Sequence, residues 1–254
     1  MHHEITITTA NHVAVIQICR PPANYFDHGL IGELVRSAFE LQTNGTRVIV
    51  LCSEGKHFCA GANFASQALE NDRTRSSKLL YREAIRLFEV EIPIIAAVQG
   101  SAVGGGLGLA CAADFRVASP GTRFHANFSS LGFHQGFGLS VTLPEIVGAQ
   151  QGMDLLYTSR RIDGQRALEI GLADRLVPDG DTRDAALNWA EEIAQVAPLA
   201  VRSIKATLRG GLIQRVRAVL DRELAEQGRL WATKDSEIGI AANLARERPI
   251  FVGE

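Results

Sequence analysis

The sequence predicts an α/β domain built from strand–strand–helix units and followed by a mostly helical C-terminal part. Short β-branched or apolar runs alternate with helically spaced segments at least twice before about residue 125. From Asp181 onward, apolar residues recur at helical spacing and strand signals are few. A chain of 254 residues is long enough for one large domain or two modest ones.

The first predicted elements are a hairpin and a helix. The polar turn TANH separates β-branched runs at 5–8 and 13–18, which indicates a β-hairpin. Residues 28–45 repeat Leu, Ile, Val and Phe at helical spacing and end on Asn44-Gly45, which favours a helix that stops there. The apolar run at 47–53 then predicts a buried strand.

The remaining elements follow from the same patterns. We expect a helix at 77–91 that ends before Pro93, and a strand at 93–100. The small residues at 105–114 predict a short, fully buried helix. The later predicted elements are strands at 115–120 and 122–126 and helices at 182–197, 199–211 and 215–233.

The composition indicates a soluble cytoplasmic protein. Hydrophobic residues make up 46% of the chain and charged residues 21%, which is typical of globular proteins. A net charge of −2 gives no reason to expect a nucleic acid or an anionic membrane as partner. No apolar run is long enough to span a bilayer, and the N-terminus lacks the apolar core of a signal peptide.

The cysteines favour reduced, buried thiols over disulfides or a metal centre. All four lie in apolar surroundings, without the spacing of a zinc site. We therefore predict no metal and no bound cofactor. The four are Cys19, Cys52, Cys59 and Cys111.

Two loops offer almost no side-chain chemistry. GKHFCAGANFAS, at 55–66, follows the strand at 47–53, and GSAVGGGLGLA, at 100–110, follows the strand at 93–100. Glycine lets another molecule approach the main chain closely, and the start of a helix presents unpaired N–H groups. Two such loops could aim two N–H groups at one point, which is the arrangement of an oxyanion hole.

The triple glycine Gly104–Gly106 could also serve packing or nucleotide binding. Close packing between a helix and a strand uses glycine in the same way. A dinucleotide-binding loop is also glycine-rich, but G-x-G-x-x-G is not met because Leu109 occupies the place of its last glycine. A nucleotide-binding oxidoreductase is therefore rejected, whereas packing and catalysis both remain open.

Five segments together resemble the enoyl-CoA hydratase/isomerase (crotonase) superfamily over nearly the whole chain. RPPANYF, at 20–26, resembles the family's early R-P-x-x-N segment, and FCAGANF, at 58–64, resembles its F-x-A-G-x-D-[LI] loop. Residues 99–119 resemble its G-x-x-x-G-G-G…CD-x-R-[IV]-A segment. RRIDGQRALEIGLADRLVP, at 160–178, and ERPIFVGE, at 247–254, resemble its later G-L-V stretch and its R-x-P-x-F-x-G ending.

The resemblance implies a crotonase-like spiral of ββα units at 1–195 and a helical oligomerisation region at 196–254. Such chains assemble as a homotrimer or a dimer of trimers. The ligand would be an acyl-CoA thioester, so coenzyme A enters as part of the substrate. The amide N–H groups of Ala62 and Gly105 would form the oxyanion hole and stabilise an enolate-like intermediate. Further substrate contacts are expected from Ala60, Gly61, Asn63, Phe64, Gly104 and Phe128.

The chain departs from the family at the two glutamates with which its hydratases handle a water molecule. By position, Gly108 replaces the first glutamate and Phe128 the second. The isomerases with one glutamate keep it at the second position, and the dehalogenase-like members need an aspartate that 132–138 does not contain. The residues with which the family binds the thioester are therefore matched, whereas the glutamates with which it transfers protons are not.

His134 is the first candidate to replace the glutamates. The matching family loop lines the acyl pocket, and a neutral imidazole can exchange a proton near neutral pH. The alternative is a structural histidine that binds backbone groups. His125 and Asn127 alternate along the run TRFHAN, at 122–127, and so share a face, but one sequence does not reveal whether that face meets the pocket.

Two functions follow. The first is an acyl-CoA enzyme of the enoyl-CoA hydratase/isomerase type, a lyase or isomerase, with hydrolysis, decarboxylation and ring-opening also open. The alternative is a catalytically silent CoA-ester-binding protein or oligomer partner. Phe128, Phe133 and Phe137 suggest a hydrophobic or aromatic acyl pocket.

Overall fold

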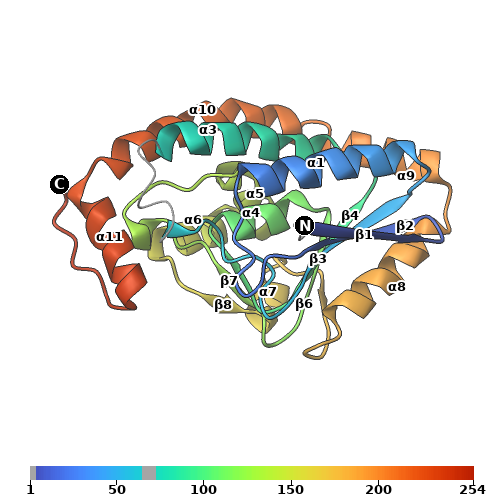
Figure 1. The fold of residues 1–254 in the computed structure, drawn as a ribbon, viewed down its shortest axis with the longest axis horizontal. Coiled ribbons are helices and arrows are strands. Elements are labelled where there is room, and N and C mark those ends of the chain that lie inside the picture. Colours follow the sequence, from blue (N-terminus) through green and yellow to red (C-terminus); the bar gives the residue numbers. More distant parts are fainter. Residues whose placement is uncertain (1–3, 65–72) are drawn as a thin grey trace.

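The computed structural model describes residues 4–64 and 73–254, and its centre is a six-stranded sheet (Figure 1). The strand order is β1-β2-β3-β4-β6-β9. The first two strands pair antiparallel, and every later pair is parallel. The strands are β1 (Ile5–Ala10), β2 (Val13–Ile18), β3 (Val48–Ser53), β4 (Ile94–Val98), β6 (Phe115–Ala118) and β9 (Arg175–Leu176).

A second, smaller sheet has the strand order β5-β7-β8. Its strands are β5 (Ser101–Val103), β7 (Arg123–His125) and β8 (Ile162–Asp163). β5 follows β4 after Gln99-Gly100, where Gly100 has a φ of 59° that favours glycine. The chain therefore turns at this point from the large sheet into the small one.

Helices cover both faces of the large sheet because alternate strand residues point to opposite sides. On one face, Val50 and Ile95 pack with Ala186 and Ala190 of α8. On the other face, the strands share one core with α1, α3, α4 and α10. The helices are α1 (His28–Thr43), α3 (Arg73–Ala84), α4 (Gly105–Ala112), α5 (Leu139–Val147), α6 (Ala149–Thr158), α7 (Gly164–Glu169), α8 (Thr182–Ala194), α9 (Pro198–Arg209), α10 (Leu212–Trp231) and α11 (Lys234–Ala245), with 3₁₀ helices η1 (Ile85–Glu89) and η2 (Ser129–Leu131).

The predicted fold class, an α/β core with a helical C-terminal part, is confirmed. The hairpin, α1 and the buried helix α4 lie where the sequence predicts them. The helix expected at 77–91 begins earlier, at Arg73, and its last part is the 3₁₀ helix η1. The sequence does not predict helices α5, α6, α7 and α11: Pro144 lies inside α5 and Gly148 separates α5 from α6, so the pattern there resembles a loop.

The C-terminal helices differ in how they meet the core. α10 runs beside α3 and contacts α5 (Figure 1), and its Val216, Leu220 and Leu224 are buried in the main core. By contrast, α9 has no buried residue. The division at 195/196 stays a prediction. Within the described ranges 4–64 and 73–254, no helix has the length and apolar character needed to cross a membrane.

Candidate active site

Backbone hydrogen bonds hold the two glycine-rich loops side by side. Cys59 N–H donates to the Ser101 carbonyl at 3.0 Å, and Val103 N–H donates to the Cys59 carbonyl at 3.0 Å. Gly61 then lies so close to β5 that a Cβ would stand 2.7 Å from the Val103 carbonyl oxygen. Its φ of 84° also disfavours any side chain. This position therefore requires glycine on both counts.

The second loop ends at the start of α4. Gly104 caps this helix with a φ of 54°, and its N–H donates to the His125 carbonyl at 2.8 Å. Gly105 is the first residue of α4, so its N–H has no acceptor within the helix and lies at the positive end of the helix dipole. Cβ atoms at Gly105 and Gly106 would stand 2.2 Å from Phe26 Cζ and 2.2 Å from the Cys59 carbonyl oxygen. Close packing, one of the two roles that the sequence leaves open, thus requires these glycines.

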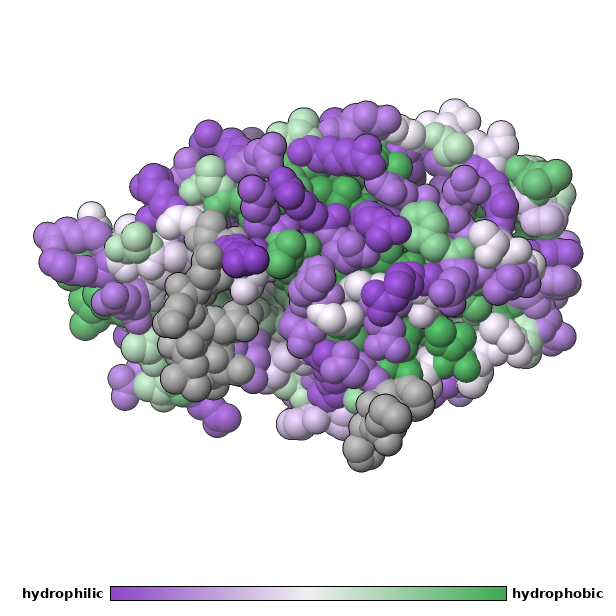
Figure 2. All heavy atoms as spheres, turned by 45° about the horizontal axis from the view of Figure 1, so that its top comes forward, coloured by the Kyte–Doolittle hydropathy of each residue, from purple (hydrophilic) through white to green (hydrophobic). Residues whose placement is uncertain are grey.

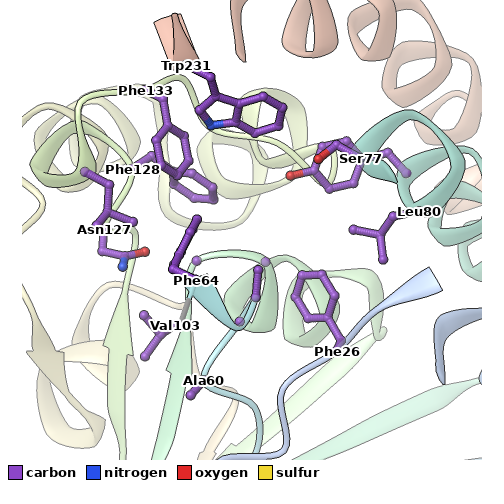
Figure 3. A pocket seen from close by; sticks show the side chains of 16 residues that line it. Phe26, Ala60, Phe64, Ser77, Leu80, Val103, Asn127, Phe128, Phe133 and Trp231 are labelled. Carbon is purple, nitrogen blue, oxygen red and sulfur yellow. The ribbon is translucent and has the colours of Figure 1, made fainter. Parts of the chain in front are cut away.

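The loops, α3, α10 and the segment after β7 enclose a cavity of about 50 Å³ (Figure 3). Ala62 and Gly105 both line it. Five of the six predicted substrate-contact residues line it as well, and Asn63 does not. The five are Ala60, Gly61, Phe64, Gly104 and Phe128.

Aromatic rings form much of the cavity wall (Figure 3). The Phe133 ring centroid lies 5.8 Å from that of Phe64, 6.1 Å from that of Phe128 and 5.8 Å from that of Trp231. Within the described part of the chain, no Asp, Glu, His, Lys or Arg side chain lines this cavity. Such walls exclude water and strengthen the electrostatic effect of backbone N–H groups that point inward.

Tyr81 is a polar wall residue that stays neutral. Its hydroxyl oxygen accepts a hydrogen bond from Gln227 Nε2 at 3.2 Å. Burial of the side chain raises the pKa of Tyr81 well above its usual range, although the bond from Gln227 opposes this shift. The phenol therefore acts as a hydrogen-bonding group rather than as a base near neutral pH.

An aromatic ring fills the space beside Gly108. A Cβ on this residue would stand 2.6 Å from Phe137 Cβ and 2.7 Å from its Cγ. Phe137 in turn packs at 5.8 Å from Phe26 and 6.2 Å from Tyr81. A glutamate at position 108 would therefore require Phe137 to move.

The structure places His134 beside the cavity but not on its wall. Its Nδ1 lies 2.8 Å from the Gln135 carbonyl oxygen. Its own carbonyl accepts a bond from Gln227 Nε2 at 3.0 Å, while the neighbouring Phe133 does line the cavity. A catalytic role for His134 stays a prediction, and no contact with the cavity supports it.

A buried carboxylate on α10 fixes the loop that carries these aromatic residues. Glu223 accepts hydrogen bonds from Gly138 N–H at 2.9 Å and from Ser140 N–H at 3.0 Å. Burial raises the pKa of Glu223, and these hydrogen bonds oppose the shift. Because α10 anchors this loop, it determines where Phe133 and Phe137 lie.

Two other polar groups near the loops are engaged in packing or ion pairing. Cys59 is fully buried, and burial raises the pKa of its thiol to about 12, so it is a protonated core residue rather than a nucleophile. The Arg20 guanidinium binds Asp27 at 2.8 Å and also contacts Glu4. Within the described residues, no group of three or more His, Cys, Asp or Glu side chains is arranged to hold a metal ion.

Several wall residues could not be identified from the sequence. Phe26 precedes α1, Ser77 and Tyr81 lie on α3, and Trp231 is the last residue of α10. Each has the character of an ordinary core residue or helix surface residue. Only the packing of α3 and α10 over the two loops brings them to one cavity.

Comparisons with known proteins agree with this fold. Residues 8–254 match the profile of the enoyl-CoA hydratase/isomerase family. A putative enoyl-CoA hydratase/isomerase of Bacillus subtilis is 32% identical over 259 residues, which covers 100% of each chain. The crotonyl-CoA hydratase of Syntrophomonas wolfei is 30% identical over 258 residues, with 100% of this chain and 99% of the relative covered.

Solved structures show the same architecture. The crystal structure of an enoyl-CoA hydratase/isomerase from Pseudoalteromonas atlantica superposes with a TM-score of 0.87 at 27% identity, covering 98% of this chain and 100% of that one. The fold is therefore the crotonase fold. The chain belongs to the enoyl-CoA hydratase/isomerase family.

Proposed function

We propose that the protein is an enzyme that binds an acyl-CoA thioester and activates its carbonyl group with the amide N–H groups of Ala62 and Gly105. The observation that carries this proposal is that both residues line one cavity, in loops joined by the pairing of Cys59 with Ala102. The relatives named as enoyl-CoA hydratases support a thioester substrate.

The chemistry follows from the position of Gly105. As the first residue of α4 it has an N–H without an intrahelical acceptor, at the positive end of the helix. A thioester oxygen bound there and at Ala62 would carry negative charge more easily, so an enolate-like species becomes accessible. Residues 60–64 would lie along the pantetheine arm, and Phe64 and Phe128 would pack on the acyl group.

The proposed reaction differs from the hydration that the family's hydratases catalyse. We propose that Gly108 and Phe128 stand where family hydratases have glutamates, and no charged side chain lines the described cavity. Efficient hydration of crotonyl-CoA is therefore not expected. Isomerisation, hydrolysis, decarboxylation or ring-opening could each use the enolate-stabilising groups, with His134 as the candidate for proton transfer.

Two ligands that differ only in one group, a carbonyl in the first and a methylene in the second, test the binding mode. Butyryl-CoA has the thioester carbonyl oxygen and S-butyl-CoA lacks it. We expect calorimetry to show butyryl-CoA binding roughly tenfold more tightly, since a preorganised pair of donors meets the oxygen. Equal affinities would contradict the proposed oxyanion hole.

Turnover then separates the enzyme from its alternative, a silent CoA-ester-binding protein or oligomer partner. A panel of acyl-CoAs, with crotonyl-CoA followed by loss of its enoyl-thioester absorbance, is incubated with wild type and His134→Ala. An enzyme shows turnover with at least one ester, and dependence on His134 appears as lost turnover with retained binding. The absence of charged wall residues in the described cavity is the observation that keeps the silent protein as the alternative.

We also propose that residues 196–254 join chains into a trimer or a dimer of trimers in the cytoplasm. On α9, Leu199 and Leu208 are each 78% exposed and Ile204 is 57% exposed. The face drawn in Figure 2 is mostly hydrophilic, with hydrophobic residues exposed at several places. Light scattering of the 27.5 kDa chain tests this, with Leu208→Glu expected to lower the mass. A monomeric wild type would contradict it.

A further inference from the structure

Asn127 presents an unpaired amide to the cavity. The residue is only 8% exposed, and it lines the cavity beside Phe128 (Figure 3). Its backbone carbonyl accepts a bond from Ser130 Oγ at 2.8 Å. Its side chain, however, has no hydrogen-bond partner among residues 4–64 and 73–254.

The neighbouring polar residues differ from Asn127 in this respect. His125 Nε2 lies 2.7 Å from the Ser159 carbonyl oxygen, and Ser129 Oγ donates to the Leu156 carbonyl at 2.8 Å. The shared face predicted for His125 and Asn127 is therefore divided between two environments, because β7 ends at His125. Because no group of the described residues binds the Asn127 amide, a group that enters the cavity can hydrogen-bond it without displacing a partner.

The position of the amide defines where that group must lie. Asn127 Oδ1 would stand 2.9 Å from a Cβ on Gly104, so it lies against the residue that precedes Gly105. A hydrogen bond spans about 3 Å. If the thioester oxygen binds Gly105 N–H, a group that meets Asn127 is within a few bonds of the thioester carbon. No charged side chain accompanies the amide in the described cavity, which favours a neutral oxygen over a carboxylate.

We propose that the Asn127 side chain is a specificity-determining residue that hydrogen-bonds a neutral hydroxyl or keto oxygen near C3 of the acyl chain. This inference rests on the proposed acyl-CoA function. The amide both donates and accepts, so it can bind either kind of oxygen. Phe64, Phe128 and Phe133 enclose the remaining acyl carbons.

Two isosteric ligands test the inference. 3-Hydroxybutyryl-CoA, as each enantiomer, is compared with isovaleryl-CoA, in which a methyl group replaces the hydroxyl. Calorimetry on wild type should show one hydroxylated enantiomer binding roughly tenfold more tightly. Asn127→Leu keeps the size of the side chain and should remove that preference while leaving isovaleryl-CoA affinity nearly unchanged. Ultraviolet spectra confirm that no enoyl-CoA forms during the titration.

Each outcome has a distinct meaning. A wild type without preference for the hydroxyl overturns the inference, even if the leucine variant does not fold. A preference that persists in a folded Asn127→Leu also overturns it. If neither ester binds the wild type, the proposed acyl-CoA function fails, which is a different result from equal binding of both esters.

Discussion

The two walls of the cavity are held in different ways. On one wall, backbone atoms of the segments at 58–64 and 101–106 touch so closely that glycine is required at Gly61 and Gly106. On the other wall, side chains of α10 hold the segment with Phe133 and Phe137 through Glu223 and Gln227. Direct backbone contact leaves little freedom on the first wall. The second wall can change its chemistry by substitution, and we expect differences in reaction to arise there.

The largest expected loss of stability comes from a substitution in the wall that backbone atoms form. Gly61 and Gly45 share a φ of +84°, but only Gly61 has a backbone atom in the way, since Gly45 has nothing within 4 Å of an added Cβ. Gly61→Ala should lower the free energy of unfolding by about 3 kcal/mol or more, through backbone strain plus the clash with Val103. Gly45→Ala, the matched control, should cost about 1 kcal/mol. Urea denaturation measures both, and equal losses would show that the loop contact adds nothing.

The next largest loss of stability is expected in the wall that side chains of α10 hold in place. Glu223→Ala leaves the N–H groups of Gly138 and Ser140 without their acceptor, so the unfolding free energy should fall by about 3 kcal/mol. Glu226→Ala, on the same helix, is the control: this carboxylate pairs with Arg229 at the surface, and little change is expected. A similar, small loss in both variants would mean that Glu223 does not anchor the loop.

A smaller effect comes from the phenol on this wall. Tyr81→Phe removes the hydroxyl that accepts from Gln227 and keeps the ring that packs on Phe137. We expect a loss of about 1 kcal/mol in thermal or urea unfolding. Tyr157→Phe, on an exposed side chain, serves as the control. A larger loss than in Glu223→Ala would show that the hydrogen bond from Gln227 to Tyr81 stabilises this wall more than the hydrogen bonds to Glu223 do.

The smallest effect is a pH dependence of the same wall. Burial raises the pKa of Glu223 above its ordinary value of 4.5, so the folded state keeps the proton at pH values where the unfolded chain has released it. This stabilisation is fully present below pH 4.5 and is lost as the pH rises through the raised pKa. Relative to Glu223→Gln, wild type should therefore lose stability as the pH rises above 4.5. The opposite slope would show that the carboxylate is held ionised.

The wall formed by the two glycine-rich loops could be predicted from the sequence because the residue patterns that indicate it are local. Strands followed by glycine-rich segments identify the two loops, and the family resemblance assigns Ala62 and Gly105 within them; both residues line the cavity. The second wall depends on contacts between distant elements: Tyr81 and Trp231 reach the cavity only when α3 and α10 pack over it. The direction of the His134 side chain depends on the Gln135 carbonyl, which no residue pattern reveals. For Asn127, the two-residue alternation of a strand fails because β7 has already ended.

The most direct test is the carbonyl stretching frequency of a bound thioester. Butyryl-CoA labelled with ¹³C at the carbonyl is bound to the protein and examined by isotope-edited infrared difference spectroscopy. If Ala62 and Gly105 donate to the carbonyl oxygen, the C=O bond weakens and its band moves to lower frequency than in water. A band at the solution frequency, with the ester shown to be bound, would contradict the proposed activation of the thioester.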